Sequence, residues 1–276
     1  LHPRVRRQRQ MCIRDSIYAG DLLGQLIATS FGLMKYEIPM FGLYGACSTM
    51  GEALSLGAMC VNAGYAENVI ALASSHFASA EKQFRYPLEY GNQRPLASTW
   101  TVTGAGAYIV GNKPLDKKKC VLIKGITTGK IVDYGVKDSM NMGACMAPAA
   151  AELIEANFKD LDVDKDYYDA IFTGDLGEIG NRILSELLKE KGIDIADKLF
   201  DCGMLIYEGE TKCSGGSGCG CSAVVLGTYI MDKLVRGEYK RVLFAPTGAL
   251  LSTVSYNEGK SVPGIAHGVI LEGRES

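Results

Sequence analysis

The chain has 276 residues, of which 47% are hydrophobic and 22% charged, so it can bury the core of one or two globular domains. Its 29 Lys and Arg residues against 31 Asp and Glu give a net charge of -2, without the basic excess of a nucleic-acid-binding protein, so we expect no nucleic-acid partner. No stretch reaches the roughly 18 consecutive apolar residues of a membrane span.

Residues 1–16 differ in composition from the rest of the chain. They carry five arginines and one acid, and they lack the amphipathic spacing of a transit peptide. We therefore expect residues 1–16 to be a foreign leader outside the fold. No secretory hydrophobic region is present, so we expect a soluble, cytoplasmic chain without a signal peptide.

A strand followed by a helix occurs twice in the chain, and in each copy a later helix leads through a glycine turn into a buried strand. Short, continuously apolar strands that alternate with helices predict an α/β fold. Two such copies predict two similar halves. The paired segments are strands 18–22 and 172–176, helices 23–35 and 179–191, helices 54–62 and 222–235, and strands 69–73 and 241–245.

The second copy begins with an additional strand over 121–131 and an additional helix over 147–158. We therefore divide the chain into an N-terminal half, residues 17–113, which lacks its first strand and helix and so looks truncated, and a C-terminal half, residues 114–276. We expect the lacking strand to belong inside the first sheet, and its absence to expose an edge that promotes aggregation.

The segment 42–53 is the most informative one for chemistry. It leads from a strand through small residues into a helix, and it places Cys47 at or beside the start of that helix. Free N–H groups at a helix start favour thiolate over thiol, so this position suits a nucleophile. A small buried cysteine at a crowded turn fits the spacing equally well.

The other cysteines give no signal for a metal or a cofactor. The tightest group, Cys213, Cys219 and Cys221, has gaps of five residues and one residue, whereas zinc ligands are usually separated by two to four. The glycines at 218 and 220 superficially match a dinucleotide fingerprint, but no ribose-binding acid follows at the required distance. We expect no metal site and no cofactor.

The strand, the segment Gly-Ala-Cys-Ser-Thr and the helix, inside a duplicated unit, resemble the thiolase and ketoacyl-synthase superfamily, whose nucleophile occupies this position. Longer strings over residues 17–272 resemble the stage V sporulation protein AD family. This resemblance implies a thiolase-like, duplicated five-layer α-β-α-β-α architecture. The strings that carry it are AGDLL at 19–23, GLYGACSTM at 42–50, ASSHF at 73–77, QFRYPLEYG at 83–91, WTVTG at 100–104 and PTGALLS at 246–252.

The resemblance also implies a function. The family binds dipicolinic acid, pyridine-2,6-dicarboxylate, for its uptake into the developing spore, with calcium as the counter-ion. It acts with membrane-embedded SpoVA proteins, as a peripheral subunit at the forespore and spore inner membrane, and this links it to germination. Superfamily members form homodimers, and the strand predicted over 99–110 is a candidate dimer edge.

Enzymatic activity is a separate question. Condensing enzymes need a histidine and a second histidine or asparagine to polarise the thioester carbonyl and to move protons. By the repeat these groups fall at 174–176 and 212–217, where the chain has neither residue. We therefore expect a non-catalytic binding protein. The alternatives are an acyltransferase that uses Cys47 and a purely structural partner of membrane subunits.

Asp21 and Asp175, equivalent under the repeat, are expected to cap the helices that follow them.

A pyridine dicarboxylate needs cations and flat apolar walls. Arginine suits a carboxylate because its planar fork makes two parallel hydrogen bonds, although the two candidate arginines fit a surface or an interface equally well. Of the two candidate histidines, the first is either a pocket residue or a solvated loop residue, and the second is either a ligand or a structural residue. The predicted ligand-binding residues are Cys47, His76, Arg85, Arg94 and His267.

Overall fold

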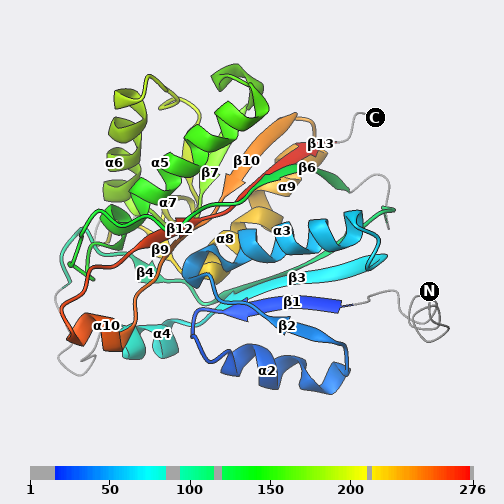
Figure 1. Cartoon of the computed structure of the whole chain (residues 1–276), viewed down its shortest axis with the longest axis horizontal. Coiled ribbons are helices and arrows are strands. Elements are labelled where there is room, and N and C mark those ends of the chain that lie inside the picture. Colours follow the sequence, from blue (N-terminus) through cyan, green and yellow to red (C-terminus); the bar gives the residue numbers. More distant parts are fainter. Residues whose placement is uncertain (1–15, 85–93, 115–119, 210–212, 274–276) are drawn as a thin grey trace.

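The structure, a computed structural model, describes residues 16–84, 94–114, 120–209 and 213–273. In these residues two β-sheets enclose a central layer of helices, and further helices cover the outer face of each sheet (Figure 1). The predicted five-layer α-β-α-β-α arrangement is confirmed. The layers are α2 (Ile27–Leu33), the first sheet, the central helices α3 (Thr49–Asn62), α8 (Cys219–Val225) and α9 (Met231–Val235), the second sheet, and the outer helices α5 (Met142–Leu161) and α6 (Gly177–Glu190).

The first sheet has the strand order β2-β1-β3-β5. The central strand β1 runs parallel to both of its neighbours, and β5 is antiparallel to β3. Buried and half-buried residues alternate along β3, because one face of the sheet packs against α3. The strands are β1 (Ser16–Asp21), β2 (Met40–Gly42), β3 (Asn68–Ser75) and β5 (Gly104–Gly111).

The second sheet has the strand order β6-β13-β10-β7-β8. Strands β10, β7 and β8 are parallel, whereas β13 is antiparallel to both β10 and β6. Every residue of β7 is buried, as expected for a strand covered by helices on both faces. The strands are β6 (Val121–Thr127), β7 (Ala170–Thr173), β8 (Leu199–Asp201), β10 (Arg241–Ala245) and β13 (Gly268–Gly273).

The two sheets share one topology. Strands β2, β1, β3 and β5 follow the same order and directions as β8, β7, β10 and β13. The additional strand β6 lies at the edge, beside β13. In the second half, β6 corresponds to the strand that the first half was expected to lack. Because β6 lies at an edge, the expectation that such a strand belongs inside its sheet is wrong. Of the described strands, only β3 pairs with β5 in the first sheet. The division between residues 113 and 114 stays a prediction. Residues 1–15 of the expected leader lie outside the described ranges, whereas Ser16 begins β1 and pairs with Val69, so the leader prediction is wrong at residue 16.

Several predicted elements differ from the structure at their ends. The helix predicted over 23–35 begins only at Ile27, because Asp21 holds the preceding turn by accepting the N–H of Leu23. The strand predicted over 99–110 is interrupted after two residues. The remaining short elements are η1 (Met34–Tyr36), η2 (Ala46–Ser48), α4 (Phe77–Phe84), β4 (Trp100–Thr101), η4 (Lys165–Tyr167), α7 (Cys202–Ile206), β9 (Gly216–Ser217), the π-helical turn η5 (Leu226–Ile230), β11 (Thr247–Ala249), α10 (Thr253–Asn257) and β12 (Gly264–Ala266).

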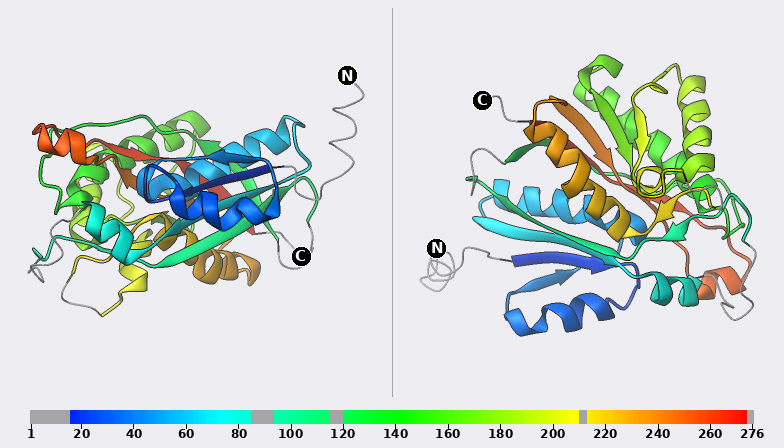
Figure 2. Two further views of the ribbon diagram at one scale, coloured as in Figure 1. Left: turned by 90° about the horizontal axis from the view of Figure 1, so that it is seen from below. Right: turned by 180° about the vertical axis from the view of Figure 1, so that it is seen from behind.

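Two apolar clusters form the core. The first lies around the central helices and includes Met50, Phe172 and Phe244, all fully buried. The second lies between the second sheet and its outer helices, and Ile154 and Leu184 are among its members. Figure 2, in the view from behind, shows α8 and α9 between the two sheets. The carboxyl ends of the parallel strands in both sheets therefore meet near the starts of α3 and α8.

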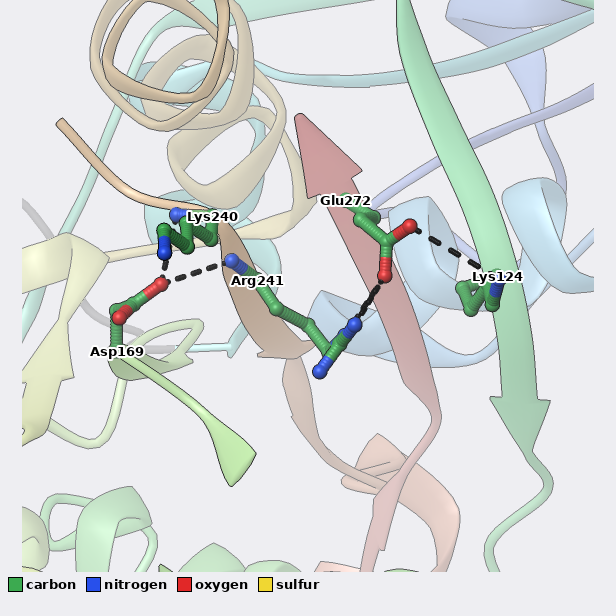
Figure 3. A network of polar contacts seen from close by, with 5 residues as sticks. All are labelled: Lys124, Asp169, Lys240, Arg241 and Glu272. Atoms are coloured by element: carbon green, nitrogen blue, oxygen red, sulfur yellow. Dashed lines mark hydrogen bonds and ion pairs between the residues drawn. The ribbon is translucent and has the colours of Figure 1, made fainter. Parts of the chain in front are cut away.

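A polar network fixes the opposite end of the second sheet (Figure 3). One carboxylate oxygen of Asp169 accepts the backbone N–H groups of Lys240 and Arg241, at 2.7 and 2.8 Å. The Arg241 guanidinium donates from Nε to Glu272 at 2.8 Å, and Lys124 lies 3.9 Å from the second oxygen of Glu272. These contacts join the starts of β7 and β10 to β13 and β6, so we assign the network a structural role.

None of the helices in the described part of the chain combines the length and the apolar composition needed to cross a membrane.

Candidate functional site

The turn that carries Cys47 is held by its own side chains. Ser48 Oγ donates to the carbonyl of Gly45 at 2.7 Å, and Thr49 Oγ1 donates to the carbonyl of Ala46 at 2.7 Å. Ala46 has a φ of 50°, a left-handed conformation that costs energy in a residue with a Cβ. Gly248 of β11 packs directly on this turn, since a Cβ there would lie 2.3 Å from the Gly45 carbonyl oxygen. The sequence therefore builds a sharp, tightly packed elbow.

Asp175 is the polar partner of Cys47. It follows β7 and is 1% exposed, and the Cys47 thiol donates a hydrogen bond to its carboxylate. The carboxylate also accepts the hydroxyl of Thr247 at 2.9 Å and the backbone N–H of Gly218, at the start of α8, at 3.1 Å. The prediction that Asp175 caps the following helix is wrong. Asp201 has that role instead, because it accepts the N–H groups of Leu176 and Gly177 at the start of α6.

Burial sets the protonation of this pair. The pKa of the Cys47 thiol is raised well above its ordinary value, first by desolvation and then by the nearby charge of Asp175. Desolvation also raises the pKa of Asp175 from 3.8 to about 6, against the lowering effect of the Cys47 and Gly218 hydrogen bonds. Of the two interpretations left open for Cys47, the site therefore favours the buried thiol over the helix-start thiolate. At neutral pH the sulfur keeps its proton and donates a hydrogen bond to the carboxylate.

A small cavity adjoins Cys47 and reaches toward the junction of the two halves. Its volume is about 20 Å³, which is room for one or two water molecules. The parallel pairing of β4 with β9 forms part of its wall. The lining residues are Leu22, Tyr44, Ala46, Cys47, Ala80, Glu81, Thr101, Met142, Ser217, Ala249 and Leu251.

The predicted ligand-binding residues lie at different places around this cavity. Cys47 lines it, and Arg94 is buried beside it, where Nη2 lies 2.9 Å from Glu81. His76 is exposed, before α4, with Nδ1 3.4 Å from Ser79 Oγ. His267 is half-buried between β12 and β13, and desolvation lowers its pKa. In the described residues neither histidine lines the cavity, and Arg85 lies outside these residues.

Sequence reasoning missed the roles of Asp175 and Glu81. The signal for Asp175 was available, because the repeat placed it where condensing enzymes have a histidine. Glu81 gave no signal, because its position at the cavity depends on the packing of α4 against β4. Asp21 was predicted to cap the helix that follows it, and it accepts the N–H of Thr29, in the first turn of α2, at 2.9 Å and the Thr29 hydroxyl at 2.8 Å. In the described ranges no group of three or more His, Cys, Asp or Glu residues is arranged to hold a metal ion.

The duplicated sheets and the cysteine elbow define a thiolase-like protein. Similar solved structures include AbyA1, a tetronic acid condensing enzyme, with a TM-score of 0.61, 16% identity, and coverage of 94% of this chain and 79% of that one. Acat5 thiolase from Ascaris suum in complex with coenzyme A gives a TM-score of 0.58, 10% identity, and coverage of 95% and 88%. At these identities the likeness concerns the fold alone.

The family follows from closer relatives. The family model for stage V sporulation protein AD (SpoVAD) matches residues 8–272. Stage V sporulation protein AD of Bacillus subtilis (strain 168) is 44% identical over 259 residues, which are 94% of this chain and 75% of that protein. The chain belongs to the stage V sporulation protein AD family and is thus a sporulation protein.

Proposed function

We propose that this protein binds dipicolinic acid at the Cys47 cavity for its uptake into the developing spore. It acts as a homodimer with membrane-embedded SpoVA proteins, as a peripheral subunit at the forespore inner membrane, and calcium accompanies the ligand as its counter-ion. The family membership supports a role in spore formation. The position of the cavity, where the strands of two α/β halves end, supports a small-molecule site.

The observation that carries the proposal is the Cys47–Asp175 pair. An acyl-transfer nucleophile needs a thiolate, or a base that can remove its proton. Cys47 has a raised pKa and donates to a carboxylate that is itself a weak base, with a pKa of about 6. A protonated thiol in an enclosed cavity suits a binding site. A cavity of about 20 Å³ is much smaller than a pyridine dicarboxylate, so the walls must separate when the ligand enters.

Calorimetric titration of the whole chain with dipicolinate tests the proposal. We expect saturable binding that Cys47→Leu abolishes, because the larger side chain fills the cavity, and that Cys47→Ser retains. The matched control is Tyr65→Ala, since Tyr65 is 78% exposed and lies between α3 and β3. No heat of binding at millimolar dipicolinate, in a folded protein, would remove the proposal.

The second candidate function is acyl transfer by Cys47, and the elbow with its left-handed Ala46 is the observation that favours it. Incubation with acetyl-CoA followed by intact mass measurement separates the two functions. An acyl adduct that is absent from Cys47→Ser would identify an enzyme. An unmodified wild-type chain that still binds dipicolinate would support the binding protein.

A further inference from the structure

The Arg94 side chain is buried next to the cavity in an aromatic setting. It is only 8% exposed, and its guanidinium carbon lies 5.7 Å from the ring centre of Phe77 and 5.6 Å from that of Trp100. Such faces attract a cation and keep its plane in place. The guanidinium is therefore oriented by its surroundings before any ligand arrives.

Two hydrogen-bond donors at this place lack an acceptor among the described residues. Arg94 Nη1 and Trp100 Nε1 are both buried, and neither has a hydrogen-bond partner in the described part of the chain. Buried donors are rarely left unpaired in folded proteins, and each unpaired one favours any acceptor that can reach it. Because these donors belong to side chains in direct contact, they favour an acceptor with two oxygens, such as a carboxylate.

Glu81 connects this pair of side chains to the cavity. One of its carboxylate oxygens lies 2.9 Å from Arg94 Nη2, and the other accepts the backbone N–H of Thr101 at 3.0 Å. Glu81 and Thr101 both line the cavity beside Cys47. The Glu81 carboxylate thus lies between Arg94 and the cavity, and it already pairs with one nitrogen of the guanidinium.

We propose that Arg94 and Trp100 form a carboxylate subsite that gives the cavity its preference for a dicarboxylate. The inference rests on the proposed function above. One carboxylate of the ligand accepts hydrogen bonds from Arg94 Nη1 and Trp100 Nε1 and competes with Glu81 for the guanidinium charge. The rest of the ligand occupies the cavity toward Cys47. Glu81 holds the place of the ligand carboxylate when the site is empty.

The experiment compares two ligands on the whole chain. Dipicolinate has two carboxylates, whereas picolinate, pyridine-2-carboxylate, has the same ring and only one. Calorimetry gives both affinities, and Trp100 fluorescence gives a second readout because the chain contains one tryptophan. We expect the wild type to prefer dipicolinate by about 10-fold to 100-fold, the effect of hydrogen bonds to a charged group. Arg94→Gln should reduce this preference to nearly one and leave the affinity for picolinate almost unchanged.

Two further variants keep the test decisive if Arg94→Gln does not fold. Trp100→Phe retains the cation and removes one N–H, so it should weaken dipicolinate several-fold and spare picolinate. Glu81→Gln removes the competing charge and should strengthen dipicolinate binding. The inference is overturned if the variants weaken both ligands equally, or if Glu81→Gln weakens dipicolinate. A wild type that binds no dipicolinate removes the proposed function as well, whereas unchanged ligand preference in Arg94→Gln removes the subsite alone.

Discussion

Replacing Asp175 by Asn should remove a pH-dependent cost of folding. The carboxylate of Asp175 is buried and its pKa is raised from 3.8 to about 6, so the folded protein holds this proton more tightly than the unfolded chain does. Because the pKa of Asp175 is higher in the folded chain than in the unfolded chain, its contribution to stability is complete at a pH below the unfolded-state pKa. This contribution is lost as the pH rises through the folded-state pKa. The full loss is about 3 kcal/mol, from about 1.4 kcal/mol for each pKa unit.

The asparagine variant should fit the same position. Its carbonyl oxygen can accept the N–H of Gly218, and its amide can donate to the Thr247 hydroxyl and the Cys47 sulfur, which both have acceptor capacity. Asp175→Asn therefore keeps the hydrogen bonds and loses the buried charge. Relative to wild type, its free energy of unfolding should increase by about 2 kcal/mol between about pH 4.5 and about pH 7.5, the part of the 3 kcal/mol that falls in this range.

Urea unfolding followed by circular dichroism, at a series of pH values, measures this difference. A second variant, Cys47→Ala, tests the cause. It removes the thiol hydrogen bond, which lowers the pKa of Asp175, so the stability of Cys47→Ala should fall more steeply with pH than that of the wild type. If the wild type and Asp175→Asn keep a constant difference across the range, the carboxylate is not the buried titrating group, and the argument for a protonated Cys47 loses its basis.

Two other properties can be measured on the same protein. Alkylation by iodoacetamide at neutral pH should leave Cys47 unmodified while the half-buried Cys60 and Cys120 react, because the raised pKa of Cys47 leaves almost no thiolate. Peptide mass mapping measures the order in which the cysteines react. Modification of Cys47 before the other two would contradict this expectation. Gly248→Ala should cost about 1–3 kcal/mol of stability in thermal unfolding, since its Cβ would meet a backbone carbonyl at 2.3 Å. The control is Gly32→Ala, because Gly32 lies in the exposed face of α2 with open space around it. This substitution should increase the free energy of unfolding by about 0.5–1 kcal/mol. Equal effects of the two substitutions would show that the close approach at Gly248 is unimportant.

Sequence patterns predicted most strands and the α/β class, because short apolar runs between helices are a local signal, whereas the five layers were implied by the family resemblance. The ends of the elements were predicted less well. The helix expected from residue 23 begins at Ile27 because a side-chain contact of Asp21 organises the preceding turn. The position of β6 at the sheet edge also required the structure, since strand order is set by pairing between distant segments and leaves no periodic signal in the chain.

The site shows why residue type and spacing were insufficient for chemistry. The sequence correctly placed Cys47 at a helix start, and that position alone favours a thiolate. In the folded chain, desolvation and the carboxylate of Asp175 act in the opposite direction and prevail, because both side chains are buried. The same enclosure brings Glu81 and Arg94 together from segments thirteen residues apart, with the ion pair shielded from water. The direction of the Cys47 pKa shift therefore depended on which acidic side chain the fold placed next to the sulfur. Only the repeat indicated that neighbour in advance, because it set Asp175 at the position of a catalytic histidine.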